Sequence, residues 1–215
     1  MRSRGLTSVL ALGVLLAAVS PAVVHADLIV SNGDFETPVV PAPWPNYVEY
    51  NAGDNIDGWT VGFGSVDVMG PDRQAASGNQ SVDLSGSAAG SIYQDLETEP
   101  GQSYLLRFAM AANPEGPPVI KTMEVDWGAT VVDTPTSDST NKTISDMGWT
   151  YLEYTVTATA ATTRLQFVSL VDTAFGPEID DVSVTPTSAV PEPAALSLMG
   201  LGAAALLRRR ARARR

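Results

Sequence analysis

Short runs of alternating apolar and polar residues, separated by clusters of Gly, Asn, Asp and Pro, extend over most of this chain. In the clearest run, residues 152–158, Leu152, Tyr154, Val156 and Ala158 alternate with polar residues. A period of two places every second side chain on one face of a β-strand. No long window has the 3.6-residue apolar period of an amphipathic helix. The pattern therefore predicts an all-β domain of roughly eight to ten short strands, arranged as an antiparallel sandwich of two sheets.

Several segments have a predicted core face made of alternate apolar residues. Residues 104–110 are largely apolar on both faces, which is typical of a strand that is buried on both sides. Residues 28–30 are predicted to form a short first strand, and the polar stretch 133–146 is predicted to form a loop. The predicted inward residues are Val66, Val68, Val82, Leu84, Tyr104, Leu106, Phe108, Met110, Met123, Val125, Trp127, Leu152, Tyr154, Val156, Ala158, Leu165 and Phe167.

Cysteine is absent, and the single histidine, His25, lies near the N-terminus. A domain that begins after His25 can have no disulfide, thiol nucleophile, Ser-His-Asp triad, or zinc site made of His or Cys. Any catalysis by such a domain would depend on carboxylates, tyrosines and lysines.

The N-terminus has the parts of a secretory signal peptide. Arg2 and Arg4 precede an apolar segment at residues 6–19, and Val24 and Ala26 are small residues at a plausible cleavage position. Residues 1–26 are therefore predicted to be removed. They leave one β-sandwich domain at residues 27–185, which is long enough for a core of its own, and a linker at residues 186–190.

The C-terminus also has three parts. An apolar run of 14 residues, 194–207, lies between Pro191, Glu192 and Pro193 on one side and an arginine cluster that begins with Arg208, Arg209 and Arg210 on the other. The run predicts an apolar helix that is shorter than the ~20 residues needed to cross a bilayer core. The basic cluster would keep that end of the chain in the cytoplasm. An amphipathic surface helix is the alternative, although leucines on all sides of the run disfavour it.

This tail, residues 191–215, resembles the PEP-CTERM sorting signal of Gram-negative bacteria that make extracellular polysaccharide. The resemblance implies that the chain enters the inner membrane transiently through residues 194–207 and that an exosortase cleaves it near residues 191–193. It further implies that the protein is released outside the cell or held at the cell surface.

The two end segments conceal the acidity of the domain between them. They hold eight of the 13 basic residues and one of the 24 acidic residues, so 23 acids remain against five bases. Such a surface repels phosphate groups, which excludes nucleic acid as a partner. It suits divalent cations, and solubility outside the cell is the alternative reason for it.

Four short motifs follow one another in the predicted domain: Asn-Gly-Asp-Phe-Glu at residues 32–36, Gly-Trp-Thr-Val at 58–61, Gly-Ser-Val-Asp-Val at 64–68, and Phe-Gly-Pro-Glu-Ile-Asp-Asp-Val-Ser-Val at 175–184. Together they resemble the secreted galactose-binding-like jelly rolls, in particular the choice-of-anchor C domains and the DUF642 proteins, which also resemble carbohydrate-binding modules. The resemblance covers residues 28–185 and implies a jelly roll.

The same resemblance implies a structural Ca²⁺ between the first and last strands. Glu36 and Asp180 are the predicted side-chain ligands, and Asp34 and Asp181 are second choices; carboxylate and carbonyl oxygens are what Ca²⁺ prefers. Simple alternation places Asp180 on the face of Val182 and Val184, where a buried carboxylate would need a cation. Surface carboxylates or turn caps are the alternative roles for these residues.

Sugar recognition requires an exposed aromatic platform. Trp44, Tyr47 and Tyr50 are the candidates, because they lie at a predicted loop rich in proline and asparagine. Packing of these rings onto their own domain is the alternative. Trp59, Trp127 and Trp149 lie in or beside strand patterns, so they are predicted to pack in the core.

Three functions are compatible with the sequence. The first is a non-catalytic surface or matrix protein that binds carbohydrate, either exopolysaccharide or a plant-wall glycan. The second is a structural or adhesive biofilm protein without a specific ligand. The third is a glycosidase with two carboxylates, although no motif places such a pair across a cleft.

Overall fold

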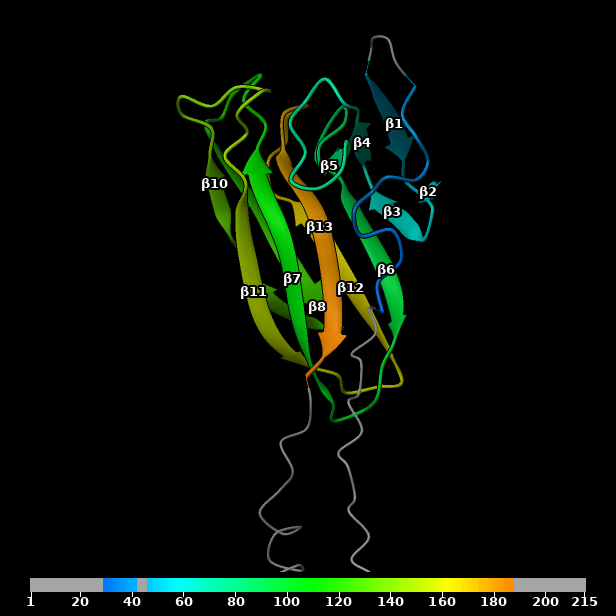
Figure 1. The fold of residues 1–215 in the computed structure, drawn as a ribbon. Helices are drawn as coiled ribbons and strands as arrows, with labels where there is room; N and C mark the ends of the chain where they lie inside the picture. Colours follow the sequence, from blue (N-terminus) through cyan, green and yellow to red (C-terminus); the bar gives the residue numbers. More distant parts are fainter. Residues whose placement is uncertain (1–28, 42–45, 188–215) are drawn as a thin grey trace, which may run out of the picture.

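The computed structural model describes residues 29–41 and 46–187 (Figure 1). These residues form strands and loops, and none of them is helical. The strands lie in two antiparallel sheets that face each other across one core, so the all-β sandwich expected from the sequence is confirmed.

Six strands form the first sheet and seven form the second, with short β9 attached to β8. The first sheet has the order β1 (Tyr47–Asn51), β4 (Ser65–Met69), β5 (Ser81–Asp83), β13 (Pro177–Pro186), β7 (Ser103–Ala112) and β11 (Thr150–Thr157). The second sheet has the order β10 (Thr136–Asp138), β8 (Ile120–Trp127), β12 (Thr162–Ser169), β6 (Ser91–Glu97), β3 (Trp59–Phe63) and β2 (Asn55–Ile56), and β9 is Thr130–Asp133. Consecutive long strands, from β6 to β8 and from β11 to β13, alternate between the sheets, as in a jelly roll.

Aromatic side chains connect the two sheets through the core. Phe108 of the first sheet meets Phe167 of the second edge-on, with 5.0 Å between ring centroids, and Trp59 lies 6.0 Å from Phe167. These contacts add geometric specificity to the burial of large apolar surfaces. Of the seventeen residues predicted to face inward, fifteen are buried, and Leu152 and Tyr154 are partly buried against the core.

The Asn-Gly-Asp-Phe motif attaches the N-terminal segment to β13. The Val182 amide donates to the Gly33 carbonyl at 2.8 Å, and Phe35 lies fully buried 5.6 Å from Trp59. A Cβ atom on Gly33 would lie 1.9 Å from the Val182 carbonyl oxygen, so a side chain cannot fit there. The motif therefore packs the N-terminal segment against β13 and the core.

Two local predictions were wrong. Residues 29 and 30 are not assigned to a strand, although the Ile29 amide donates to the Val184 carbonyl at 3.1 Å. The stretch 133–146 is not only a loop, because it contains β10, which pairs with β8. A three-residue strand is too short to show an alternation, and only its partner stabilises it.

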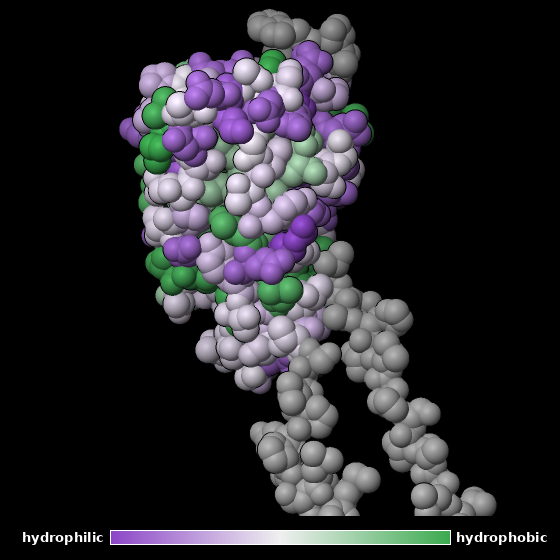
Figure 2. All heavy atoms as spheres, turned by 60° about the vertical axis from the view of Figure 1, so that its left-hand side comes forward, coloured by the Kyte–Doolittle hydropathy of each residue, from purple (hydrophilic) through white to green (hydrophobic). Residues whose placement is uncertain are grey.

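The two ends of the sandwich differ. The described chain leaves the domain at Thr187, at the lower end in Figure 1, whereas the strand order places the loops after β5 and β7 and the loop before β13 at the upper end. Figure 2 shows hydrophilic side chains gathered over that upper end.

Candidate functional site

Four carboxylates form a row across the outer face of the first sheet, near its loop end. Glu49 of β1 lies directly opposite Asp67 of β4, Asp67 lies opposite Asp83 of β5, and Asp83 lies opposite Glu178 of β13. Their neighbours along the strands, such as Val66, point into the core, so the carboxylates point away from it. We call Glu49, Asp67, Asp83 and Glu178 the acidic row.

The inner half of the acidic row is fully buried and hydrogen-bonded. Glu178 pairs with Arg73 and accepts from the Ser81 hydroxyl at 3.1 Å. Asp83 accepts from the Asn113 amide at 2.6 Å and from the Gly176 backbone N–H at 3.1 Å. Burial raises the pKa of both carboxyls, and for Asp83 the charge of Glu178 adds to this effect. The resulting network holds the loops that carry Asn113 and Gly176 against the sheet.

The outer half of the row faces solvent. The Glu49 carboxylate accepts from the Ser65 hydroxyl at 2.6 Å, and from the Ser87 hydroxyl at 2.6 Å and its amide at 2.9 Å, and these hydrogen bonds lower its pKa. Burial and the charge of Glu49 raise the pKa of Asp67 to about 7. Within the described residues, the buried Oδ1 atom of Asp67 has no hydrogen-bond partner. Asp67 therefore lacks a donor for one of its carboxylate oxygens.

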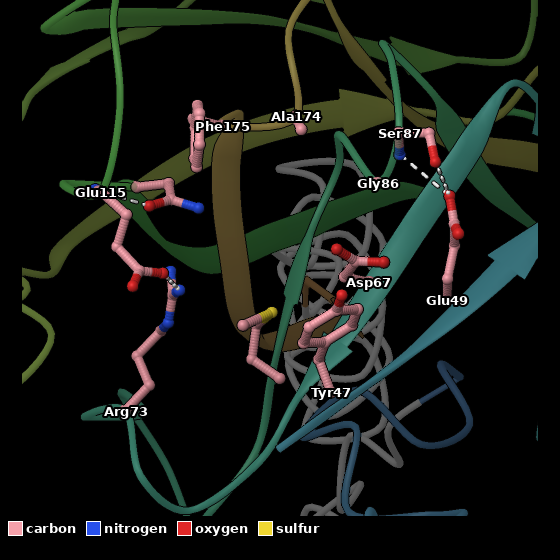
Figure 3. A pocket seen from close by; sticks show the side chains of 11 residues that line it. Tyr47, Glu49, Asp67, Arg73, Gly86, Ser87, Glu115, Ala174 and Phe175 are labelled. Atoms are coloured by element: carbon pink, nitrogen blue, oxygen red, sulfur yellow. Dashed lines mark hydrogen bonds and ion pairs between the residues drawn. The ribbon is translucent and has the colours of Figure 1, made fainter. Parts of the chain in front are cut away.

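A pocket of about 230 Å³ opens over this half of the row (Figure 3). In Figure 3, Asp67 lies between Arg73 and Glu115 on one side and Glu49 and Ser87 on the other, with Tyr47 below it. The residues that line the pocket are Tyr47, Glu49, Asp67, Met69, Arg73, Gly86, Ser87, Asn113, Glu115, Ala174 and Phe175.

Two aromatic rings border the pocket. The Tyr47 side chain is 42% exposed, and the Phe175 side chain is half-buried. Phe175 packs on Gly116, where a Cβ atom would lie 2.1 Å from the Phe175 ring. The pocket thus combines apolar ring surfaces with hydrogen-bonding groups, the combination that sugar rings require of a binding site.

The three aromatic residues predicted to bind sugar have different positions. Trp44 lies outside the described residues. Tyr47 and Tyr50 lie on β1, not in a loop, and so they point to opposite sides: Tyr47 lines the pocket, whereas Tyr50 packs against the core. Tyr50 is therefore excluded from the pocket.

The three remaining tryptophans were predicted to pack in the core. Trp59 and Trp127 do so, and their indole N–H groups donate to the carbonyls of Asn32 and Thr157, at 3.1 Å each. Trp149 does not belong to the core. It is half-buried, and its indole N–H donates to the Gln74 carbonyl at 2.8 Å.

Glu36 and Asp180, the predicted calcium ligands, hold the same loop between β4 and β5. The Asp180 carboxylate is buried and accepts from the amides of Ala76 at 2.8 Å and Ser77 at 2.7 Å. The Glu36 carboxylate accepts from the amides of Asn79 at 2.6 Å and Gln80 at 2.8 Å. Both residues therefore cap loop amides.

The second-choice ligands lie elsewhere. Asp34 is exposed, whereas Asp181 accepts from Arg107 and from the Tyr151 hydroxyl, at 3.0 Å each. The predicted face of Asp180 was also wrong. Between Asp180 and Ser183 the register of β13 against β7 shifts, and Asp181 has a φ of 48°. This β-bulge adds one residue, so Asp180 and Val182 point to opposite sides of the sheet.

The hydrogen bonds of Glu36 and Asp180 do not test the predicted calcium ion. N–H donors face both carboxylates, whereas Ca²⁺ needs about six to eight oxygen ligands. Within residues 29–41 and 46–187, no group of three or more His, Cys, Asp or Glu side chains could hold a metal ion. The calcium site stays a prediction.

The predicted targeting segments cannot be described in the same way. The signal peptide and the sorting residues Pro191, Glu192, Pro193, Arg208, Arg209 and Arg210 lie outside the described residues. The part of the chain that the structure describes has no helix long and apolar enough to cross a membrane.

Most of the pocket was not predicted from the sequence. Asp67 and Phe175 belong to motifs that were recognised, but nothing marked them as pocket residues. Glu49, Arg73 and Glu115 belong to no motif. The alternation at residues 65–69 shows that Asp67 points away from the core, but strand pairing alone places Glu49 and Asp83 beside it.

The fold and the acidic row define a jelly-roll domain with an open, polar pocket. Family comparison matches residues 28–185 to "Protein of unknown function (DUF642)" and residues 189–213 to the PEP-CTERM protein-sorting motif. The chain belongs to the DUF642 family, and its sorting motif directs export through the inner membrane of a Gram-negative bacterium to the cell surface or the extracellular space.

One curated relative is Halomucin from Haloquadratum walsbyi, with 28% identity over 165 residues. The match covers 74% of this chain but only 2% of Halomucin, so the chain spans a very small part of that relative.

Among solved structures, the chain is similar to a family 61 carbohydrate-binding module in complex with β-1,4-galactotriose, with 17% identity, a TM-score of 0.44, and coverage of 75% of this chain and 100% of the module. It is also similar to a xylan-binding domain from Paenibacillus barcinonensis, with 18% identity, a TM-score of 0.43, and coverage of 77% of this chain and 97% of that domain.

Proposed function

We propose that this domain is a non-catalytic carbohydrate-binding module of an exported surface or matrix protein, with its binding site in the pocket above the acidic row. One observation carries the proposal: the exposed ring of Tyr47 and the half-buried carboxylate of Asp67, one oxygen of which has no donor among the described residues, line the same pocket. A sugar can place an apolar face on the ring and donate a hydroxyl to the carboxylate.

The position of the pocket supports this function. It lies at the loop end of the sandwich, whereas Thr187, directly before the sorting motif, lies at the other end. A chain held at the cell surface by its C-terminal side would present the pocket outward, toward extracellular or plant-wall polysaccharide.

Binding of the full chain to a glycan array tests the proposal. We expect binding that Tyr47→Ala abolishes. Tyr151→Ala is the matched control, because Tyr151 is equally exposed, at 42%, on β11 of the same sheet. Retained binding by Tyr47→Ala would place the site elsewhere. Failure of the wild-type chain to bind any glycan would favour a purely structural or adhesive protein.

A glycosidase is the second candidate, and the pair formed by Glu49 and Asp67 favours it. The two carboxyls are cross-strand neighbours whose pKa values shift in opposite directions, as in many acid and base pairs. Release of reducing ends from neutral polysaccharides, lost in Asp67→Asn, would establish hydrolysis. Binding without release of reducing ends would establish the non-catalytic module.

A further inference from the structure

A second pocket, of about 290 Å³, lies beside the pocket above the acidic row. The two pockets share Tyr47, Met69, Arg73 and Glu115, so these side chains form a common wall. The second pocket adds Asn46, Gly70, Asp72 and Ile144 to the surface. Each pocket is smaller than the ~300 Å³ at which sites for drug-sized ligands begin. Because they share these four side chains, we treat the two adjacent pockets as one groove with two compartments.

Each compartment has an acceptor that needs a donor. The Asp67 side chain lines the first compartment and the Asn46 side chain lines the second, and the buried Oδ1 atom of each has no hydrogen-bond partner among the described residues. A buried acceptor without a partner costs free energy, which a donor from a ligand would recover. Sugar hydroxyls are uncharged donors that occur on every residue of a glycan chain.

The charge of the groove is negative. Four acids line it, Glu49, Asp67, Asp72 and Glu115. Among the described residues that line the two pockets, Arg73 is the only cation, and it is already paired with Glu178 and Glu115. No basic group of the groove is therefore free to receive an anionic ligand, and the acids repel one.

We infer that the groove selects uncharged glycan chains of at least two sugar residues and rejects chains that carry uronate or sulfate groups. This inference rests on the proposed function and deepens it. The two compartments set the minimum length of the bound glycan chain, because one sugar ring fills only one compartment. The acidic lining sets the charge selectivity, because a carboxylate on the sugar would lie beside carboxylates of the protein.

Calorimetric titration of the full chain tests both parts. The neutral probes are β-1,4-linked galacto-, gluco-, xylo- and manno-oligosaccharides of increasing length, starting from the monosaccharide. The charged probes are galacturonan and mannuronan oligosaccharides of the same lengths. We expect a neutral series to gain roughly tenfold in affinity from one to two or more residues, and its uronate counterpart to bind at least about tenfold more weakly.

Variants separate charge from shape. In the double variant Glu49→Gln/Asp72→Asn, the difference in affinity between the neutral and the uronate oligosaccharide should decrease. The control Glu99→Gln removes an exposed acid after β6, outside both pockets, and should leave this difference unchanged. Equal or tighter binding of uronates by the wild type would overturn the charge selectivity, and full affinity for monosaccharides would overturn the two-compartment groove. Both outcomes leave carbohydrate binding intact. Absence of binding to every probe would instead overturn the proposed function.

Discussion

Glu49 on β1 and Asp67 on β4 lie directly opposite each other, so two carboxylates form a cross-strand pair at the base of the pocket. Like charges in this position destabilise a sheet. The two environments differ, because hydroxyl and amide donors keep Glu49 ionised, whereas burial raises the pKa of Asp67 to about 7. The sheet thus tolerates the pair when Asp67 holds a proton.

Replacing Asp67 should make the stability of the protein less dependent on pH. Folding raises the pKa of Asp67 from 3.8 to about 7. Between these values the folded state binds more protons than the unfolded chain, so stability falls as the pH rises. We expect a higher Tm at pH 5 than at pH 8, and a smaller difference in Asp67→Asn.

Melting curves of the two proteins at both pH values measure this effect, with Glu99→Gln as the control. The Tm of Asp67→Asn should still depend on pH to some extent, because burial also raises the pKa of Asp180 to about 7. An unchanged difference in Asp67→Asn would show that Asp67 titrates in the same range in the folded and unfolded states.

The ring of Tyr47 should contribute directly to glycan affinity. Tyr47→Ala removes an exposed aromatic surface while its inward neighbours Val48 and Tyr50 still pack against the core. For a glycan that binds the wild type, we expect a loss of at least roughly tenfold in affinity, with little change in Tm. Calorimetry on Tyr47→Ala and Tyr151→Ala checks this, and equal losses in the two variants would contradict it.

Substitution of Gly33 should destabilise the domain. The Cβ atom of Gly33→Ala would lie 1.9 Å from the Val182 carbonyl oxygen and would push the N-terminal segment away from β13. Overpacking of this kind costs about 1–3 kcal/mol, and the contact between Phe35 and Trp59 would weaken with it.

Chemical denaturation of Gly33→Ala measures this loss. In the control Gly101→Ala, the new Cβ atom has no neighbour within 4 Å, and the cost is limited to the strain of a φ of 85°. That strain amounts to about 1–2 kcal/mol. A wild-type free energy of unfolding in Gly33→Ala would show that the N-terminal segment can move without cost.

The two carboxylates that cap the loop between β4 and β5 should stabilise it through their hydrogen bonds. We expect Asp180→Ala to lower the Tm, because the amides of Ala76 and Ser77 lose their acceptor. If no calcium ion is bound, EDTA should leave the wild-type Tm unchanged. A fall of several degrees with EDTA that Ca²⁺ restores would instead establish the calcium site at Glu36 and Asp180.

The amino-acid sequence by itself determined the all-β class, the inward face of most strands and the C-terminal sorting motif. These features depend on neighbours along the chain: alternation at residues 152–158 is enough to assign a core face to Leu152 and Val156. The position of Tyr50 was mispredicted because the proline-rich stretch before it concealed the start of β1.

Only the tertiary structure decided the site. Glu49, Asp67, Asp83 and Glu178 come from four strands that are distant in sequence, and their alignment depends on strand order and register, which no local pattern encodes. The bulge at Asp181 likewise reversed the side to which Asp180 points. Alternation is a property of one strand, whereas a pocket on a sheet requires the pairing of several strands, and that pairing is set by the whole core.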